Sequence, residues 1–293
     1  MKARMGGGIT RQLFRRALRL ASKEIPQSEL MRSALVFSPH PDDESLGCGG
    51  TIIKKRSLGA RVKLVHMTDG SAANHANLIS SQELKAIRML ESVRAAAILG
   101  IDSPDIHMLE FPDSRLSKFV AEAVSKVADI LRAEQPEEVF LPSSREPSRH
   151  SDHRATTYVV LEALRLVQRS VRVREYPIWF WHHWPWVPLW QNAGSGLGTR
   201  AVAKNSLEAW FGARAFTEFR HSVYIGDVLE RKRAALSEHK SQMERIISDS
   251  RWMTLGDIAS GQFLDCFNQD YEYFRCYGYN VETSSHSQLN TYR

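Results

Sequence analysis

Short apolar runs alternate with longer segments of helical spacing from the N-terminus to about position 180. Five runs have the length and composition of buried strands: 33–38, 61–67, 105–111, 138–141 and 171–179. Four segments between them place their apolar residues on one helical face: 44–58, 81–99, 117–133 and 152–168. This alternation predicts βαβ units, and hence an α/β fold with a Rossmann-like, largely parallel sheet and helices on both faces.

The same pattern predicts a single domain with a C-terminal extension, over residues 31–282. Its core spans 33–180, and we expect the C-terminal part, 181–282, to complete the site and the sheet. A polar tail follows at 283–293.

The segment 1–30 is predicted to form a basic helical extension. One apolar stripe along it contains Leu13, Phe14, Ala17, Leu18 and Ala21. A stripe of this kind favours packing on the edge of the domain, and peripheral contact with a membrane surface is the alternative.

Composition narrows the class of protein. Of 293 residues, 43% are hydrophobic and 25% are charged, which excludes a disordered chain and a multi-span membrane protein. No apolar run is long enough for a spanning helix. The three cysteines lack the spacing of a disulfide scaffold or a thiolate-rich zinc module, and they fit a cytoplasmic location. The net charge of +6 would be the only support for a nucleic-acid partner, so we expect none.

Residues typical of metal sites follow the first predicted strand. In such sheets, ligands bind beyond the carboxyl ends of the strands. The motif Pro-His-Pro-Asp-Asp-Glu at 39–44 places His40, Asp42 and Asp43 there, and this mix of nitrogen and oxygen donors suits a divalent cation. An aspartate that only caps the next helix is the alternative, but capping does not explain His40.

A second histidine-rich segment follows the fourth predicted strand. His150 and His153 are three positions apart at the start of a helix, so they share a face. A His₂Asp ligand set from the two strand ends would leave one position open for water, as in catalytic zinc sites. One of Asp42 and Asp43 would then ligate while the other acts as the base, and Asp152 would orient the histidine that does not ligate.

These motifs resemble the PIG-L/LmbE-type N-acetylglucosaminyl deacetylases over residues 33–160. The resemblance resumes at His239-Lys-Ser-Gln242. The matching elements are the 39–44 motif, Gly47, Gly49-Gly50, Thr68-Asp-Gly70, Arg88-x-x-Glu91, Pro112-Asp113 and His150-x-Asp-His153. Ser151 stands where the family often has proline, which should loosen the turn without removing a functional group.

The resemblance implies a divalent metal, usually Zn²⁺, although another ion such as Fe²⁺ would also fit. It implies that His40, Asp43 and His153 are the metal ligands. It also implies the other roles: Asp42 as general base, His150 as the oxyanion-polarising or proton-donating group, and Arg88 and Asp113 as substrate-binding residues.

The function predicted in this way is a metal-dependent hydrolase. It would remove the N-acetyl group from an N-acetylglucosaminyl-type amino-sugar conjugate, giving acetate and a free amine. The alternatives are hydrolysis of another amide-bearing glycoconjugate and a non-catalytic glycan-binding role. A nucleotide-binding reductase is excluded, because no glycine-rich phosphate turn follows the first strand. The acceptor part of the substrate and the oligomeric state stay open.

The segment 179–190 is rich in tryptophan. We expect Trp179 to finish a buried strand. Pro185 and Pro188 forbid a regular element further on, and irregular segments usually lie at the surface. Trp184, Trp186 and Trp190 are therefore predicted to form an acceptor-side wall or, failing that, a lipid-facing patch or a subunit contact.

Overall fold

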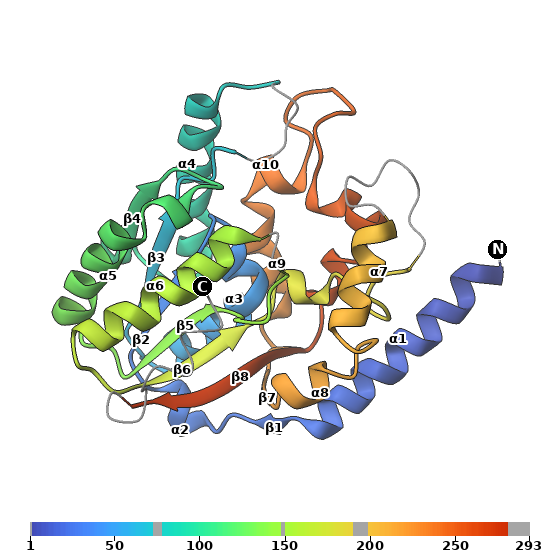
Figure 1. Ribbon diagram of the computed structural model, residues 1–293, viewed down its shortest axis with the longest axis horizontal. Helices are drawn as coiled ribbons and strands as arrows, with labels where there is room; N and C mark the ends of the chain where they lie inside the picture. Colours follow the sequence, from blue (N-terminus) through green and yellow to red (C-terminus); the bar gives the residue numbers. More distant parts are fainter. Residues whose placement is uncertain (1, 73–77, 148–149, 190–198, 281–293) are drawn as a thin grey trace.

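One mixed sheet organises the protein (Figure 1). The computed structural model describes residues 2–72, 78–147, 150–189 and 199–280. Within these residues the sheet has eight strands in the order β1-β7-β8-β6-β5-β2-β3-β4. The strands are β1 (Lys23–Glu24), β2 (Ala34–Ser38), β3 (Val62–Thr68), β4 (Ile106–Phe111), β5 (Glu138–Pro142), β6 (Val171–Tyr176), β7 (His221–Tyr224) and β8 (Tyr271–Tyr279).

The five strands from β2 to β6 run parallel to one another, whereas β8 is antiparallel to both β6 and β7. All five predicted strands are present, and the predicted largely parallel sheet is confirmed. The 171–179 run is shorter than expected. Tyr176 ends β6, since Pro177 has no N–H to continue the ladder, and Trp179–Trp181 form the short 3₁₀ helix η3.

Helices cover both faces of the sheet (Figure 1). The α-helices are α1 (Lys2–Ala21), α2 (Gln27–Leu30), α3 (Asp43–Ser57), α4 (Ser81–Leu99), α5 (Val120–Glu134), α6 (Ser151–Leu166), α7 (Thr199–Glu208), α8 (Ala215–Glu218), α9 (Leu229–Ser237) and α10 (Lys240–Met243). The remaining 3₁₀ helices are η1 (Ser103–Asp105), η2 (Leu116–Lys118), η4 (Leu255–Gly261) and η5 (Leu264–Cys266).

Alternation along the strands divides the apolar residues into two cores. Val36 and Leu64 point to the face covered by α3, α4 and α9. Leu35, Phe37 and Val65 point to the other face, where α5 and α6 pack. Because side chains alternate along a strand, each strand supplies both cores, and the sheet is buried on both sides as in other parallel sheets.

The N-terminal segment joins the same sheet. β1 pairs with β7, and Glu29 of α2 accepts a 2.7 Å hydrogen bond from the buried Arg174 of β6. Only part of the predicted apolar stripe of α1 packs. Leu18 is buried and Phe14 packs against the core, whereas Leu13, Ala17 and Ala21 are exposed, because α1 contacts the domain along a narrow face.

The predicted tail, 283–293, lies outside the described residues. None of the helices within the described ranges is long and apolar enough to cross a membrane.

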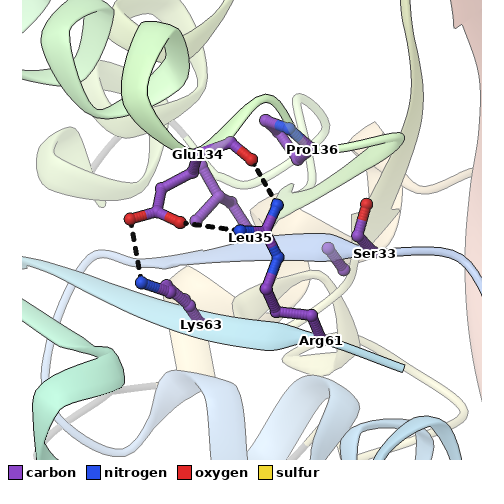
Figure 2. Close-up of a pocket in the computed structure, with 7 residues that line it drawn as sticks. Ser33, Leu35, Arg61, Lys63, Glu134 and Pro136 are labelled. Atoms are coloured by element: carbon purple, nitrogen blue, oxygen red, sulfur yellow. Dashed lines mark hydrogen bonds and ion pairs between the residues drawn. The ribbon is translucent and has the colours of Figure 1, made fainter. Parts of the chain in front are cut away.

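A small polar pocket lies at the amino ends of β2 and β3, the edge of the sheet opposite to the histidine and aspartate motifs (Figure 2). Glu134 reaches into it and pairs with Lys63 at 2.9 Å and with Arg61 at 3.4 Å. These ion pairs account for the charged groups in the pocket, which therefore offers no candidate site.

Candidate metal centre

Three predicted ligands converge where β2 and β5 end. His40 lies in the loop after β2, Asp43 begins α3, and His153 lies in the first turn of α6. Asp43 Oδ2 is 3.2 Å from His40 Nδ1 and 3.4 Å from His153 Nε2. These side chains form one of two groups that could hold a metal ion within the described residues, and the other consists of His40, Asp113 and Asp152.

The geometry of the first group fits a cation. Ligand atoms that lie about 2.1 Å from a tetrahedral zinc ion are about 3.4 Å from each other, which is close to the two separations from Asp43. His153 is fully buried, and neither of its ring nitrogens has a hydrogen-bond partner. Buried polar atoms without partners are costly, so a bound cation would remove this penalty.

Carboxylates also surround the other side of His40. Its Nε2 lies 3.3 Å from Asp113 Oδ1 and 3.5 Å from Asp152 Oδ2. Burial alone would lower the pKa of His40, but these carboxylates and Asp43 hold that pKa well above its ordinary value. So much negative charge around one imidazole favours a bound cation, with His40 Nε2–H donating to a carboxylate behind it.

Asp152 contacts His40, and its predicted role of orienting the histidine that does not ligate stays a prediction. Its carboxylate accepts hydrogen bonds from the backbone N–H groups of Ser114 (2.6 Å) and Leu116 (3.2 Å). Together with the contact to His40, these bonds occupy both oxygens. Asp152 therefore links η2 to His40 at the candidate metal centre.

Asp42 is buried next to the predicted ligand Asp43, but its carboxylate faces Arg88. It precedes α3 with a φ of 139°, a strained conformation for a residue with a side chain. Its Oδ2 lies 3.2 Å from Arg88 Nη2. Burial raises the pKa of Asp42 to about 7 even though Arg88 opposes the shift. A buried carboxyl with a pKa near neutrality is suited to accept a proton.

Arg88 of α4 is buried and binds the two loops beside the site. It donates to the carbonyl oxygens of Pro41 (2.6 Å) and Gly70 (3.0 Å). Gly70 has a φ of +64°, and a Cβ there would lie 2.8 Å from the guanidinium. Arg88 thus holds the Asp42 loop against the Thr68-Asp-Gly70 turn.

Sequence reasoning assigned no role to Glu44, although it lies in the 39–44 motif. Glu44 is fully buried and accepts hydrogen bonds from Ser38 (2.9 Å) and Ser45 (2.8 Å). His239 reaches it from the C-terminal part, with Nε2 3.5 Å from Glu44 Oε1. Burial opposes ionisation, but His239 and its neighbours hold the pKa of Glu44 far below its ordinary value.

Two matched motifs from distant parts of the chain also bind each other. Glu91 of α4 accepts hydrogen bonds from the N–H (2.8 Å) and the hydroxyl (2.7 Å) of Ser241. This contact places the His239-to-Gln242 element against the helix that carries Arg88. The C-terminal part therefore packs behind the residues of the site.

Trp179 lies at the site, although we expected it to finish a buried strand. Its ring stacks on His150 at 4.2 Å with an interplanar angle of 9°, and on Phe263 at 4.8 Å with an angle of 19°. Two protein rings thus stack on the indole of Trp179. The stack with Trp179 holds the plane of the His150 imidazole.

The expectation for the later tryptophans is wrong at Trp186. That side chain is 1% exposed and contacts Trp181 at 4.6 Å. Trp184 is half-buried and packs on Phe14 of α1 at 5.9 Å. The irregular segment is covered by α1, so it is interior despite its prolines. Trp190 lies outside the described residues.

Sequence reasoning missed Glu146, which follows β5. It is buried and accepts a 2.7 Å hydrogen bond from the N–H of Ile178. Burial raises the pKa of Glu146 well above its ordinary value. Glu146 thereby anchors the η3 segment that carries Trp179. The one feature of the sequence that could have indicated a role for Glu146 is its position just after a predicted strand.

The fold and the site together define an α/β protein with a candidate divalent-metal centre at the carboxyl edge of its sheet. Residues 35–164 match the PIG-L family, described as GlcNAc-PI de-N-acetylase. The chain is 35% identical to a diacetylchitobiose deacetylase of Thermococcus kodakarensis, over 46% of this chain and 49% of that protein. It is 29% identical to 1D-myo-inositol 2-acetamido-2-deoxy-alpha-D-glucopyranoside deacetylase of a Mycobacterium species, over 78% of this chain and 80% of that protein.

The PIG-L match thus covers the strands and loops that carry the site, and the relatives found are named as N-acetylglucosamine-type deacetylases. In the first of these matches, the chain spans only about half the length of its relative. The structure of N,N'-diacetylchitobiose deacetylase from Pyrococcus horikoshii shares the fold. It superposes with a TM-score of 0.61 at 22% identity, over 96% of this chain and 97% of that one.

Proposed function

We propose that this protein is a zinc-dependent deacetylase that acts on an N-acetylated amino-sugar conjugate and releases acetate and a free amine. The observation that carries this proposal is the convergence of His40, Asp43 and His153 beside the buried, strained Asp42. The activities of the relatives support the substrate class. The three cysteines form no disulfide, which supports a cytoplasmic location.

In this proposal His40, Asp43 and His153 hold the metal. When bound, the metal would polarise the acetyl carbonyl and acidify a water molecule. Fe²⁺ would suit the same donors, and Zn²⁺ is preferred because its borderline character matches two imidazoles and one carboxylate.

The protein's own residues would then manage the protons and the developing charge. Asp42 accepts the proton of the attacking water at its carboxylate, and Arg88 holds the loop that positions it. His150, fixed by its stack on Trp179, faces the developing oxyanion or protonates the leaving amine. Asp113 was predicted to bind substrate. We propose that it also orients His40, from which it lies 3.3 Å.

Acetate release from a panel of N-acetylglucosaminyl conjugates by metal-reconstituted protein tests this function. Asp42→Asn should retain the metal and lose about 10²–10⁴-fold in turnover, the usual contribution of a general base. His153→Ala should lose metal, measured as the zinc content after dialysis. Turnover close to wild type in Asp42→Asn would refute the base assignment. Full zinc stoichiometry in His153→Ala would refute the ligand assignment. Absence of acetate release from every conjugate by zinc-loaded protein would favour glycan binding without catalysis.

A further inference from the structure

Six of the eleven large hydrophobic side chains that are exposed among the described residues lie on two segments. They are Ile9 (60% exposed), Leu13 (61%) and Leu20 (77%) on α1, and Leu207 (64%), Trp210 (61%) and Phe211 (47%) at and just after the end of α7. We call these six residues the apolar surface. Single exposed hydrophobic residues are common, but such a concentration marks a region of interaction.

Helix α1 is apolar on two opposite sides. Phe14 and Leu18 pack inward against the core. Ile9, Leu13 and Leu20 follow one another at steps of four and seven positions, so they share the opposite side. The inward side explains how α1 attaches to the domain. The outward side needs another partner.

The second segment is a strained turn that displays aromatic rings. Trp210 and Phe211 both have left-handed backbone conformations, with φ values of 51° and 49°. Such values are rare for bulky side chains and are typical of functional positions. The turn is held by hydrogen bonds within it, including a 2.7 Å bond from Phe211 N–H to Ser206 O. The strain thus keeps two large rings at the surface.

The two segments are neighbours. A Cβ added at Gly212 would lie 3.0 Å from Phe14 of α1, so the turn packs directly on that helix. Phe211 also contacts Trp184 at 6.3 Å, and Trp184 contacts Phe14 at 5.9 Å. Figure 1 shows α1 passing beside α8 and below α7. The two exposed segments are therefore neighbours in the fold, joined through Phe14 and Trp184.

Helix α1 contributes only positive charge beside this surface, and the acidic residues near the turn, Glu208 and Glu218, are paired with Lys204 and Arg214. Between Ile9 and Ala21 the sequence contains four arginines and no acidic residue. Arg16 is exposed beside the outward side of α1, and the Arg214 guanidinium lies 5.8 Å from the centre of the Trp210 ring. A second copy of the chain would bring its own arginines against these, which is unfavourable. An anionic surface is complementary to them.

We propose that the apolar surface docks the protein onto an anionic lipid bilayer. An amphipathic helix with apolar side chains outward and arginines beside them lies in the interface plane of such a membrane. Exposed Trp210 would insert at the level of the headgroups, which tryptophan prefers. This proposal goes beyond the proposed hydrolase activity and does not depend on it.

Co-sedimentation of the full chain with vesicles tests the proposal. Vesicles of phosphatidylcholine with phosphatidylglycerol should bind the wild-type protein, and phosphatidylcholine vesicles should bind it more weakly. The double variant Leu13→Ser/Trp210→Ser should bind the anionic vesicles at least about tenfold more weakly, because it removes two anchors. Both side chains are exposed, so the fold should persist, and circular dichroism checks this.

A matched control replaces Leu90 of α4, which is 60% exposed and lies away from the apolar surface. Leu90→Ser should bind like the wild type. The proposal is overturned if the wild-type protein does not bind anionic vesicles, or if the double variant binds them as well as the wild type. It is also overturned if the double variant lowers the molar mass in light scattering while vesicle binding stays the same, since a second copy then occupies the surface.

Discussion

Gly47 lies where α3 crosses the end of β6, and no larger residue fits there. A Cβ at this position would lie 2.2 Å from Cδ2 of Tyr176 and 2.9 Å from two further ring atoms. Tyr176 is fully buried, and its hydroxyl donates a 2.7 Å hydrogen bond to the carbonyl of Phe37. The ring therefore has no free space to move into, and Gly47→Ala should destabilise the protein.

The expected magnitude follows from three contributions. Overpacking a buried site costs about 1–3 kcal/mol. Because the ring must shift to relieve the clash, the hydrogen bond of Tyr176 is lost as well, at about 1 kcal/mol. Alanine in a helix regains about 1 kcal/mol relative to glycine. The net expectation is a loss of about 2 kcal/mol in the free energy of unfolding.

Gly49→Ala is the matched control two positions along the same helix. Its added Cβ would lie 3.4 Å from the nearest atoms, a distance that a small shift of Leu99 or Lys232 relieves. Urea unfolding should place Gly47→Ala about 2 kcal/mol below the wild type and about 3 kcal/mol below Gly49→Ala, which gains helix propensity without the clash. In a Tyr176→Ala background, Gly47→Ala should cost nothing further. Equal stability of the two single variants would refute the steric argument.

Two further predictions concern histidines and their aromatic neighbours. Burial lowers the pKa of His183 to about 3 from 6.5, so the folded protein keeps it neutral while the unfolded chain protonates it. The free energy of unfolding should therefore fall as the pH drops from 6.5 towards 3. In urea unfolding, His183→Asn should reduce the slope of this free energy against pH by up to about 1.4 kcal/mol per pH unit. An unchanged slope would contradict this explanation. Trp179→Ala should lower deacetylation about tenfold with the metal content intact, because His150 loses its stack, whereas Trp184→Ala should leave the rate unchanged.

Helix-capping residues and strand ends in the sequence predicted the core of the fold well. The predicted helix at 81–99 has the same bounds as α4, because Ser80 and Glu83 form a capping box and Gly100 ends the helix with a φ of 91°. The candidate ligands were found for a related reason. They follow strand ends directly, so the topology of a parallel sheet brings them to one edge whatever the details of packing.

Contacts between distant segments could not be predicted in the same way. His239 and Phe263 both lie in the C-terminal part of the chain, yet His239 reaches Glu44 near the N-terminus and Phe263 backs Trp179. Nothing in the spacing of either residue indicates its partner. The burial of Trp186 was missed because the prolines around it suggested a surface loop, whereas the cover comes from α1, far away in the sequence.

The adjacent aspartates show where backbone geometry adds to what residue types indicate. From the residue types alone, Asp42 and Asp43 were interchangeable as ligand and base. The φ of 139° at Asp42 turns its carboxylate toward Arg88, while Asp43, the first residue of α3, presents one oxygen to both His40 and His153. A single strained residue thus separates two identical side chains into different electrostatic environments. That separation supports Asp43 as the ligand and Asp42 as the base. It also explains the strained backbone at Asp42, which keeps the two carboxylates in different environments.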